Sequence, residues 1–259
     1  MKQSPGSESP PPPAAGCDLG IVFAVPIEAD AFERLAAAVI ETRAVDLTFR
    51  EGTINGRRVA WCVSGVGVDA ATAATRLLVE GHRPRLIVSA GFAGGLAPAL
   101  PRGTVVRPAV SRIQGDAPPI PLAHPDLAAG PPLTIVTVAK VIATVAEKRL
   151  LAQASGAHLV DMETHAVATV AGATGIACGS VRVISDDATQ ELPREVAALA
   201  APQSPLRRLG AAVAAVGRRP RAAVDLWRLY EHAVVDGRTL AGALVRLIES
   251  LPSGPEISA

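Results

Sequence analysis

The stretch His158-Leu-Val-Asp-Met-Glu-Thr-His-Ala-Val-Ala168 decides the fold that we predict for this chain. Apolar residues typical of a strand open it, and a run that favours a helix follows, with Glu163 in the first turn of that helix. A helix N-terminus stabilises an acid, and ligands bind beyond the carboxyl ends of strands in open α/β sheets. Glu163 is therefore either a helix cap or an acid that faces a ligand, and this segment alone leaves both interpretations open.

Other short apolar runs predict strands buried on both faces, and amphipathic runs between them predict helices. The pair Asn55-Gly56 favours a tight hairpin turn. The expected strands cover residues 19–25, 48–54, 57–64, 85–89, 103–110, 133–138 and 179–184, and the expected helices cover residues 26–36, 68–81 and 143–154. This strand–helix–strand alternation predicts an α/β fold of three layers, αβα, around a central mixed, mostly parallel twisted sheet, with C-terminal helices added.

The chain reads as one folded unit with additions at both ends, without an internal repeat. We expect a disordered Pro- and Ser-rich tail at residues 1–16, one domain at residues 17–200 and a C-terminal helical extension packed on the same domain at residues 201–259. Within the extension, prolines punctuate the first helices, and Leu226–Leu251 is expected to form one or two amphipathic helices joined near Asp236-Gly237. Gly115–Pro132 is rich in Pro, Gly and Ala, which predicts an irregular loop.

The composition excludes several classes of partner. Lys and Arg total 25 against 24 Asp and Glu, so no surplus of positive charge attracts nucleic acid or an acidic membrane surface. Three scattered cysteines, and five histidines without ligand spacing, predict neither a disulfide framework nor a metal site. We expect no cofactor. The apolar runs are too short to span a membrane and the N-terminus lacks a signal-peptide core, so we expect a cytoplasmic protein.

Four expected strand ends carry residues that could bind or react with a ligand. They supply Glu28, the Ser64-Gly65 turn with a glycine-rich turn at residues 90–96, Met162-Glu163, and Ser185-Asp186. Glycines let a ligand approach the backbone, and their N–H groups can bind it, although such turns also serve only to pack a helix on a strand. Asp186 could likewise be a helix cap. Three carboxylates and two glycine turns at one sheet edge together favour a binding or catalytic site.

These residues lie in motifs that resemble the nucleoside phosphorylase and nucleosidase superfamily. The pattern is most similar to methylthioadenosine/S-adenosylhomocysteine nucleosidases and to hopanoid-biosynthesis-associated phosphorylase-like proteins. The motifs are Gly20-Ile-Val-Phe-Ala-Val-Pro-Ile-Glu28, Ser64-Gly-Val-Gly67, Ser89-Ala-Gly-Phe-Ala-Gly-Gly-Leu96, Val160-Asp-Met-Glu163 and Val181-Arg-Val-Ile-Ser-Asp186. Each motif alone is weak, but five in this order identify the superfamily, and residues 17–200 would then be its catalytic domain.

The resemblance implies a role for each carboxylate. Asp186 would donate a proton to purine N7, so that the base leaves neutral. Glu163 would accept hydrogen bonds from the ribose hydroxyls and stabilise the positive charge that develops on the sugar. Glu28 would orient and deprotonate an attacking water. The implied substrate-binding residues are Ser64, Gly91, Phe92, Ala93 and Gly94 on the sugar and nucleophile side, Met162 against the ribose face, and Ser185 at the base. Arg182 is expected to fix a carboxylate.

The leading functional hypothesis is hydrolysis of the N-glycosidic bond of a purine nucleoside, a 5′-modified adenosine. Phosphorylases of the superfamily hold phosphate with arginines, and neither Ala24–Glu28 nor Leu86–Ala90 contains a cation, so water is the expected nucleophile. Phosphorolysis, including that of an adenosyl lipid by a hopanoid-type enzyme, and a non-catalytic nucleoside-binding protein stay as alternatives. Superfamily members are usually homo-oligomers, which implies a homodimer here.

Departures from the methylthioadenosine enzymes concern the base and the 5′ group. The segment Ala139-Lys-Val-Ile142 lacks the Phe that those enzymes place beside adenine, and the loop at residues 115–132 is shorter than theirs. His165 is bulkier than the small residue usual two positions after the glutamate, and we expect it to pack under the sheet. The short loop resembles the hopanoid-type group, whose substrate would be a large apolar adenosine conjugate.

Overall fold

The computed structural model describes residues 16–123, 132–192 and 220–252. Some expectations fall outside these ranges. They are the disordered tail, except for Gly16, part of the loop expected at residues 115–132, and the proline-punctuated helices that follow Pro193.

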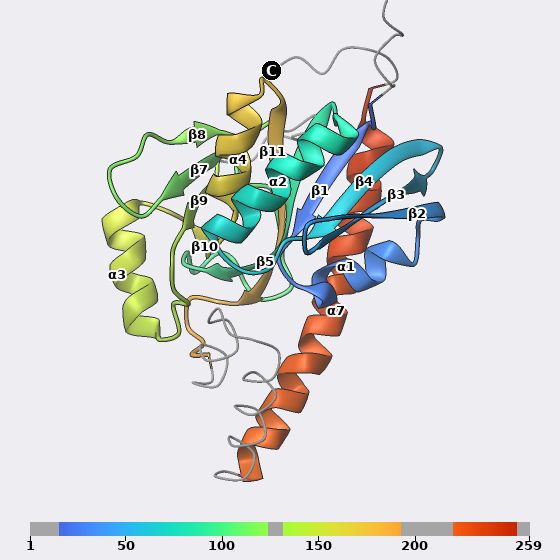
Figure 1. Ribbon diagram of the computed structural model, residues 1–259. Coiled ribbons are helices and arrows are strands. Elements are labelled where there is room, and N and C mark those ends of the chain that lie inside the picture. The colour runs from blue at the N-terminus through green and yellow to red at the C-terminus, as the bar shows by residue number, and fades with distance from the viewer. Residues whose placement is uncertain (1–15, 124–131, 193–219, 253–259) are drawn as a thin grey trace, which may run out of the picture.

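One mixed sheet of eleven strands runs through the described residues (Figure 1). The strands are β1 Leu19–Phe23, β2 Ala37–Ala44, β3 Leu47–Ile54, β4 Arg57–Val63, β5 Leu86–Gly95, β6 Val105–Val106, β7 Val110–Ile113, β8 Ile120–Pro121, β9 Thr134–Thr137, β10 Leu159–Asp161 and β11 Ala177–Asp186. Their order is β2-β3-β4-β1-β5-β10-β9-β7-β8, and β11 pairs with β5 and β6. The neighbours β4, β1, β5 and β11 are parallel, as are β10, β9 and β7. The edges of the sheet and the β5–β10 pair are antiparallel.

Helices cover both faces of the sheet, which confirms the expected three-layer α/β fold (Figure 1). On one face lie α2 (Val68–His82) and α4 (Thr164–Ala173), packed against each other. On the other face lie α1 (Pro26–Glu33) and α7 (Pro220–Ser250), also in contact. The remaining helix of the described residues, α3 (Val145–Ser155), lies at the side of the sheet, next to β9 and β10. Helices of the described residues are too short or too polar to cross a membrane.

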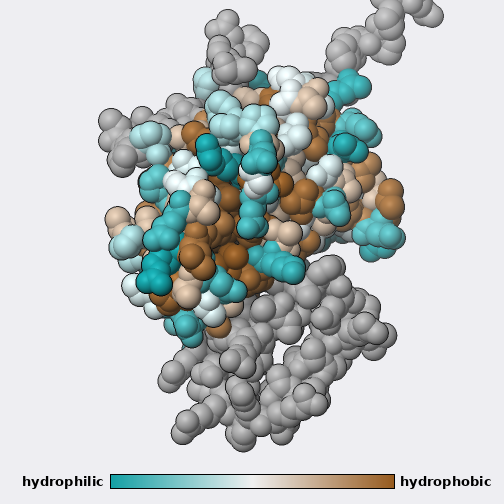
Figure 2. Space-filling model, turned by 90° about the vertical axis from the view of Figure 1, so that its left-hand side faces the viewer, coloured by the Kyte–Doolittle hydropathy of each residue, from teal (hydrophilic) through white to brown (hydrophobic). Residues whose placement is uncertain are grey.

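Each helix layer buries its own apolar face. On α2, Ala71, Ala74 and Leu78 recur at helical spacing and are buried in a cluster that also holds Val22 of β1. On the opposite face, the rings of Phe32 of α1 and Trp61 pack edge to face in a T shape, with ring centroids 5.7 Å apart. Residues of α7 complete that second cluster. Hydrophobic residues gather at the centre of the molecular face that carries α3 (Figure 2). The exposed Leu150 belongs to α3.

The parallel direction of the central strands brings several motifs to one edge of the sheet. Glu28 follows β1, Ser64 follows β4, and Ser185-Asp186 end β11. The motif Met162-Glu163 follows β10, which runs parallel to β9. This arrangement is the one that the strand pattern predicts, and it sets the place of the candidate site.

Two local predictions at the N-terminal half are wrong. Residues 37–44 form the edge strand β2, because β-branched residues there pair antiparallel with β3, and α1 ends at Glu33. The glycine-rich run at residues 90–96 is not a turn: β5 continues through Gly95, in register with β11. The glycines there let side chains come close to the backbone of the strand. A glycine-rich sequence looks the same whether it forms such a strand or a turn.

Two further differences concern helix ends. Glu163 is the N-cap residue that precedes α4 and not a member of its first turn, so its side chain is displaced from the helix toward the sheet edge. Of the one or two helices expected at Leu226–Leu251, the structure shows one, because α7 continues through Asp236-Gly237 without a joint. Gly237 lies within α7, where a Cβ would come 2.8 Å from the carbonyl oxygen of Ile27, so this glycine permits close packing and does not mark a helix end.

Candidate active site

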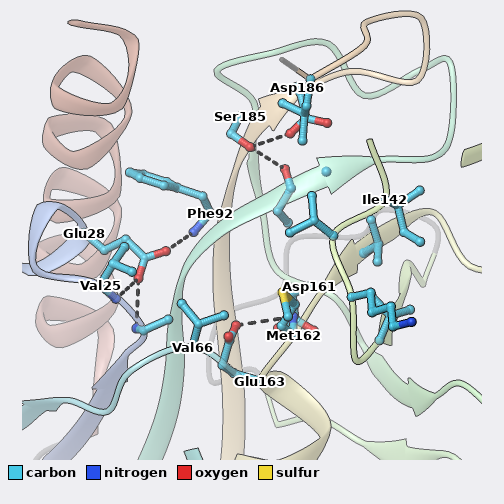
Figure 3. Close-up of a pocket in the computed structure, with 18 residues that line it drawn as sticks. Val25, Glu28, Val66, Phe92, Ile142, Asp161, Met162, Glu163, Ser185 and Asp186 are labelled. Atoms are coloured by element: carbon cyan, nitrogen blue, oxygen red, sulfur yellow. Dashed lines mark hydrogen bonds between the residues drawn. The ribbon is translucent and has the colours of Figure 1, made fainter. Parts of the chain in front are cut away.

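A pocket of about 220 Å³ opens at the sheet edge where the carboxylates were expected (Figure 3). Its lining comes from the ends of β1, β5, β10 and β11, from the segment after β9, and from Val66 before α2. The lining residues are Ala24, Val25, Glu28, Val66, Phe92, Ala93, Gly94, Val138, Lys140, Val141, Ile142, Val160, Asp161, Met162, Glu163, Ser185, Asp186 and Leu192. Three of the four carboxylates, Glu28, Glu163 and Asp186, lie on different sides of the space between them (Figure 3).

Glu28 is held as an acceptor by three backbone N–H groups. Its Oε2 accepts hydrogen bonds from Ala24 and Val25 at 2.9 and 3.0 Å, and its Oε1 accepts one from Phe92 at 2.8 Å. The carboxylate is 4% exposed, and this burial raises the pKa of Glu28 above its ordinary value, against the opposing charge of Arg182. A fixed, buried carboxylate of raised pKa is a suitable proton acceptor near neutral pH.

Arg182 lies behind Glu28 and anchors a buried polar network. Its Nη2 is 2.7 Å from Oδ2 of Asp161, 2.7 Å from Oγ1 of Thr164 and 2.5 Å from Oγ of Ser89. The expectation that Arg182 fixes a carboxylate is confirmed, and that carboxylate is Asp161. Asp161 also accepts hydrogen bonds from Thr137 and from the backbone of Thr164, which fixes the start of α4.

Glu163 is presented to the pocket by the turn between β10 and α4. Its Oε1 accepts a hydrogen bond from the backbone N–H of Gly67 at 2.8 Å, and its Oε2 accepts one from Met162 at 3.3 Å. Burial raises the pKa of Glu163 to about 8, and the nearby charge of Asp161 adds to the shift. Gly67 has a φ of 102°, a conformation that glycine adopts without strain. A glycine at this position can therefore present its N–H to Glu163 without backbone strain.

Asp186 is held by two donors. Ser185 Oγ donates to Oδ1 at 2.7 Å, and Lys148 Nζ of α3 donates to Oδ2 at 2.5 Å. Lys148 also donates to the carbonyl oxygens of Asp187 and Gln190 at 2.6 and 2.9 Å. A lysine that is only 1% exposed thus lies directly behind the carboxylate that ends β11.

Eight of the ten residues expected at the site line the pocket. They are Glu28, Phe92, Ala93, Gly94, Met162, Glu163, Ser185 and Asp186. Phe92 contributes its backbone N–H, while its ring packs toward the cluster that includes α7 (Figure 3). Ser64 and Gly91 do not line the pocket. The hydroxyl of Ser64 bonds to the carbonyl oxygens of Phe23 and Gly65, and Gly91 lies beneath Glu28 and Arg182.

Sequence reasoning missed Lys148 and the apolar wall of the pocket, except for Met162. A signal for Lys148 exists, because this lysine shares the buried side of α3 with Leu151, three positions later, and lysine is rarely buried without a partner. The apolar wall comprises Val66, Val138, Val141, Ile142, Met162 and Leu192. These positions lie in segments without regular structure, where hydrophobic periodicity carries no information.

His165 does not line the pocket. It is 7% exposed, its Nδ1 is 3.3 Å from Ser111 Oγ, and burial lowers its pKa. It packs within the fold, as expected. Across the described residues, histidine, cysteine and carboxylate side chains do not gather in any group of three or more that could hold a metal ion.

Fold and site together define an α/β protein with a small-molecule pocket in which fixed carboxylates face an apolar wall. The chain belongs to the Phosphorylase superfamily, whose sequence profile it matches over residues 18–134 and 132–215. Among curated relatives, a 5′-methylthioadenosine/S-adenosylhomocysteine nucleosidase of Haemophilus influenzae (strain PittEE) is 38% identical over 88 residues, which is 34% of this chain and 38% of the relative. The nucleosidase of Anoxybacillus flavithermus is 32% identical over 89 residues, with the same coverage. The chain thus spans 38% of the length of these relatives.

Solved structures are similar over nearly the whole chain. A methylthioadenosine/S-adenosylhomocysteine nucleosidase from Neisseria meningitidis, in complex with methylthio-immucillin-A, has a TM-score of 0.70 at 16% identity and covers 90% of this chain and 99% of its own. The futalosine hydrolase of Helicobacter pylori has a TM-score of 0.69 at 16% identity and covers 91% and 98%. At these identities the similarity shows the fold, which is the α/β fold that the sequence predicts.

Proposed function

We propose that this protein is an enzyme that hydrolyses the N-glycosidic bond of a purine nucleoside, a 5′-modified adenosine. The observation that carries the proposal is the placement of Glu28, Glu163 and Asp186 on three sides of one pocket, each held by donors of its own. Departure of a base from a sugar leaves positive charge on the sugar and negative charge on the base. A site for this reaction needs a carboxylate near the sugar, a proton for the base and an acceptor for the proton of water.

Each carboxylate has a position that suits one of these needs. Glu28, buried and fixed by three N–H groups, accepts the proton of the attacking water. Glu163, beside Met162, binds the ribose hydroxyls and stabilises the cationic sugar. Asp186, together with Ser185, faces the base and delivers the proton that lets it leave neutral.

The charges around Glu28 favour water over phosphate as the nucleophile. The guanidinium of Arg182 is close enough to Glu28 to oppose the rise of its pKa, but it is already paired with Asp161. The described residues that line the pocket include no arginine, so an incoming phosphate would meet the carboxylate of Glu28 without a guanidinium to hold it. A neutral water encounters no such repulsion.

The apolar wall supports a substrate with an apolar 5′ group. Val66, Met162 and Ile142 all line the pocket and offer no charge to a polar substituent. Among the described residues that line the pocket, Lys140 is the single cation, and it is exposed. Structural relatives that act on, or bind analogues of, methylthioadenosine share the fold, which agrees with a thioether or alkyl substituent at this position.

The substitution Asp186→Asn tests the acid role. It keeps the shape of the side chain and removes the proton that the base needs, so adenine release from methylthioadenosine is expected to fall about 10²–10⁴-fold. Asp30→Asn, an exposed change on α1, is the matched control and should release adenine at the native rate. Because Asn would leave Lys148 without its carboxylate, the unfolding temperature is measured alongside. Normal turnover in a folded Asp186→Asn protein contradicts the proposal.

The resemblance to the superfamily also supports a homodimer located in the cytoplasm. Hydrophobic surface at the centre of the α3 face is consistent with an interface there (Figure 2). Light scattering coupled to size-exclusion chromatography measures the mass of the assembly directly. A monomeric mass at micromolar concentration contradicts the dimer.

A further inference from the structure

Lys148 is the buried cation of α3 and lies directly behind the base side of the pocket. All three protons of its ammonium group have an acceptor: Oδ2 of Asp186 and the carbonyl oxygens of Asp187 and Gln190. A buried ammonium is costly unless it is paired and hydrogen-bonded, and here it is both. The structure therefore holds Lys148 as an ammonium next to a pocket carboxylate. In the described residues, the other side chain that hydrogen-bonds to this carboxylate is Ser185.

The helix that carries Lys148 is anchored at both ends. Thr144 caps its N-terminus and accepts a hydrogen bond from the N–H of Glu147, whose carboxylate bonds back to Thr144. Gly156 ends the helix in the left-handed conformation with φ of 66°. A rigid helix of this kind holds Lys148 at one position relative to Asp186.

The hydrogen bonds of Asp186 leave it without a proton to give. Both of its carboxylate oxygens accept: Oδ1 from the hydroxyl of Ser185 and Oδ2 from the ammonium of Lys148. A carboxylate that accepts at both oxygens is in its ionised form. The base that leaves from a purine nucleoside nevertheless needs a proton, so Asp186 needs a proton donor of its own. Of the two neighbours, only the ammonium is an acid, since a serine hydroxyl does not ionise at neutral pH.

We propose that Lys148 is the source of the proton that Asp186 passes to the departing base. The inference deepens the proposed hydrolysis and rests on it. Lys148 acts through Asp186 and does not line the pocket, so it is a positioning and proton-supplying residue and not one that touches the substrate.

The transfer balances as follows. One N–H bond of Lys148 breaks as an O–H bond forms on Oδ2 of Asp186, which leaves a neutral amine and a neutral carboxylic acid. That O–H bond then breaks as an N–H bond forms at N7 of the base, while the electron pair of the C1′–N9 bond moves into the purine. Water adds to C1′ and gives its proton to Glu28. After product release Glu28 gives that proton to solvent, and a proton from solvent restores the ammonium of Lys148.

The charges that surround the pair are known from each neighbouring element. From the end of β11, Asp187 faces Lys148, and its pKa lies below the usual range because Thr189 donates to it and because Lys148 is close. From α3 itself, Glu147 is engaged at the helix N-terminus. Across the pocket lie Glu28, Glu163 and, at its rim, Lys140. None of these groups donates to Asp186 in the hydrogen bonds of the described residues.

The test compares two leaving groups in the full-length protein. Adenine needs a proton to leave, whereas 4-nitrophenolate leaves as a stable anion. We measure release of adenine from methylthioadenosine and of 4-nitrophenolate from a 4-nitrophenyl riboside that carries the same 5-methylthio group. Lys148→Met removes the ammonium, and Lys148→Arg keeps the charge in a group that does not give up its proton. Arg149→Met, an exposed change on the same helix, is the matched control.

We expect both Lys148 variants to lose about 10²–10⁴-fold in kcat for adenine release, the range typical of general acid help, and to keep 4-nitrophenolate release near the native rate. Adenine release by Lys148→Met should recover as the pH is lowered, because protons from solvent then take the place of the one that the ammonium supplied. A structural role would instead reduce both leaving groups alike at every pH, and that result overturns the inference. Native adenine release in a Lys148 variant also overturns it. If the native protein releases nitrophenolate but no base, the proposed purine hydrolysis is wrong and the inference falls with it.

Discussion

Gly91 and Glu28 lie so close that a Cβ on Gly91 would be 2.4 Å from Oε1 of the carboxylate. The same Cβ would be 2.6 Å from Nη1 of Arg182. Strand β5 thus carries a glycine where Arg182 meets Glu28, the carboxylate that we propose accepts the proton of water. The relationship explains why a glycine-rich run continues as a strand at this point: the close approach is made by side chains, not by a turn of the backbone.

We therefore expect Gly91→Ala to displace Glu28 by about 1 Å and to reduce kcat about 10²-fold, the loss that a misplacement of this size can cause. Gly81→Ala on α2 is the matched control, because a Cβ there has no neighbour within 4 Å among the described residues. That control should keep full activity and gain about 0.5–1 kcal/mol in the free energy of unfolding, because alanine favours the helix. Equal activities of the two variants, measured by adenine release, would argue against a catalytic position for Glu28.

Glu28→Gln removes the proton acceptor but keeps the size of the side chain. Since Gln cannot accept a proton from water, hydrolysis is expected to fall about 10²–10⁴-fold, while the affinity for adenine, which binds near Asp186, changes little. Adenine affinity is measured by calorimetry and hydrolysis by base release. Asp30→Asn, two positions along α1 and exposed, should behave as the native protein. A parallel loss of adenine binding and hydrolysis would indicate a collapsed pocket instead.

Glu163 makes stability depend on pH. Its pKa is about 8 in the folded protein against an ordinary value of 4.5, so the folded state binds more protons than the unfolded state between these values. The stability that this carboxyl contributes is present below pH 4.5 and is lost as the pH rises toward 8, by at most about 1.4 kcal/mol per pH unit. The Glu163→Gln variant has no carboxyl at this position, so it does not lose this stability as the pH rises. We expect the unfolding temperature of the variant, relative to the native protein, to rise from pH 5 to pH 8, and a constant difference would contradict the raised pKa.

The packing of α7 on α1 can be tested with two glycines of the same helix. A Cβ on Gly237 would lie 2.8 Å from the carbonyl oxygen of Ile27, next to Glu28, whereas one on Gly242 would meet only the flexible end of Arg246 at 3.7 Å. Gly237→Ala is expected to lower the free energy of unfolding by about 1–3 kcal/mol through overpacking. Gly242→Ala is expected to raise it by about 0.5–1 kcal/mol. Chemical denaturation measures both, and equal effects would show that α7 does not press on α1 at this point.

The sequence was sufficient for the α/β class and for the pocket carboxylates because both depend on local patterns. Buried parallel strands read as continuous apolar runs, and the residues that follow them necessarily meet at one sheet edge. That rule places Glu28 and Asp186 together. Glu163 follows β10, which pairs antiparallel with the end of β5, so its place with them was expected from the resemblance of its motif. The edge strand β2 could not be predicted from the sequence, because its residues are mostly exposed and show little hydrophobic periodicity.

The sequence pattern does not reveal which side chains pair when they are far apart in the chain. Asp186 and Lys148 are 38 positions apart, and Arg182 and Asp161 are 21 apart, so only the folded chain shows that they pair. The glycines of β5 show the same limit, because a turn and a strand crossed by side chains both favour glycine. The charges that tune a site come from such pairs, which is why the carboxylates could be predicted and their partners could not.

The central claim is that this pocket hydrolyses a purine nucleoside. The most direct measurement is product analysis after incubation of the native protein with methylthioadenosine in phosphate-free buffer and again with added phosphate. We predict free adenine and free 5-methylthioribose at the same rate in both. Adenine release that requires phosphate, with a sugar 1-phosphate as the second product, would contradict hydrolysis, and the absence of adenine in both buffers would contradict the claim as a whole.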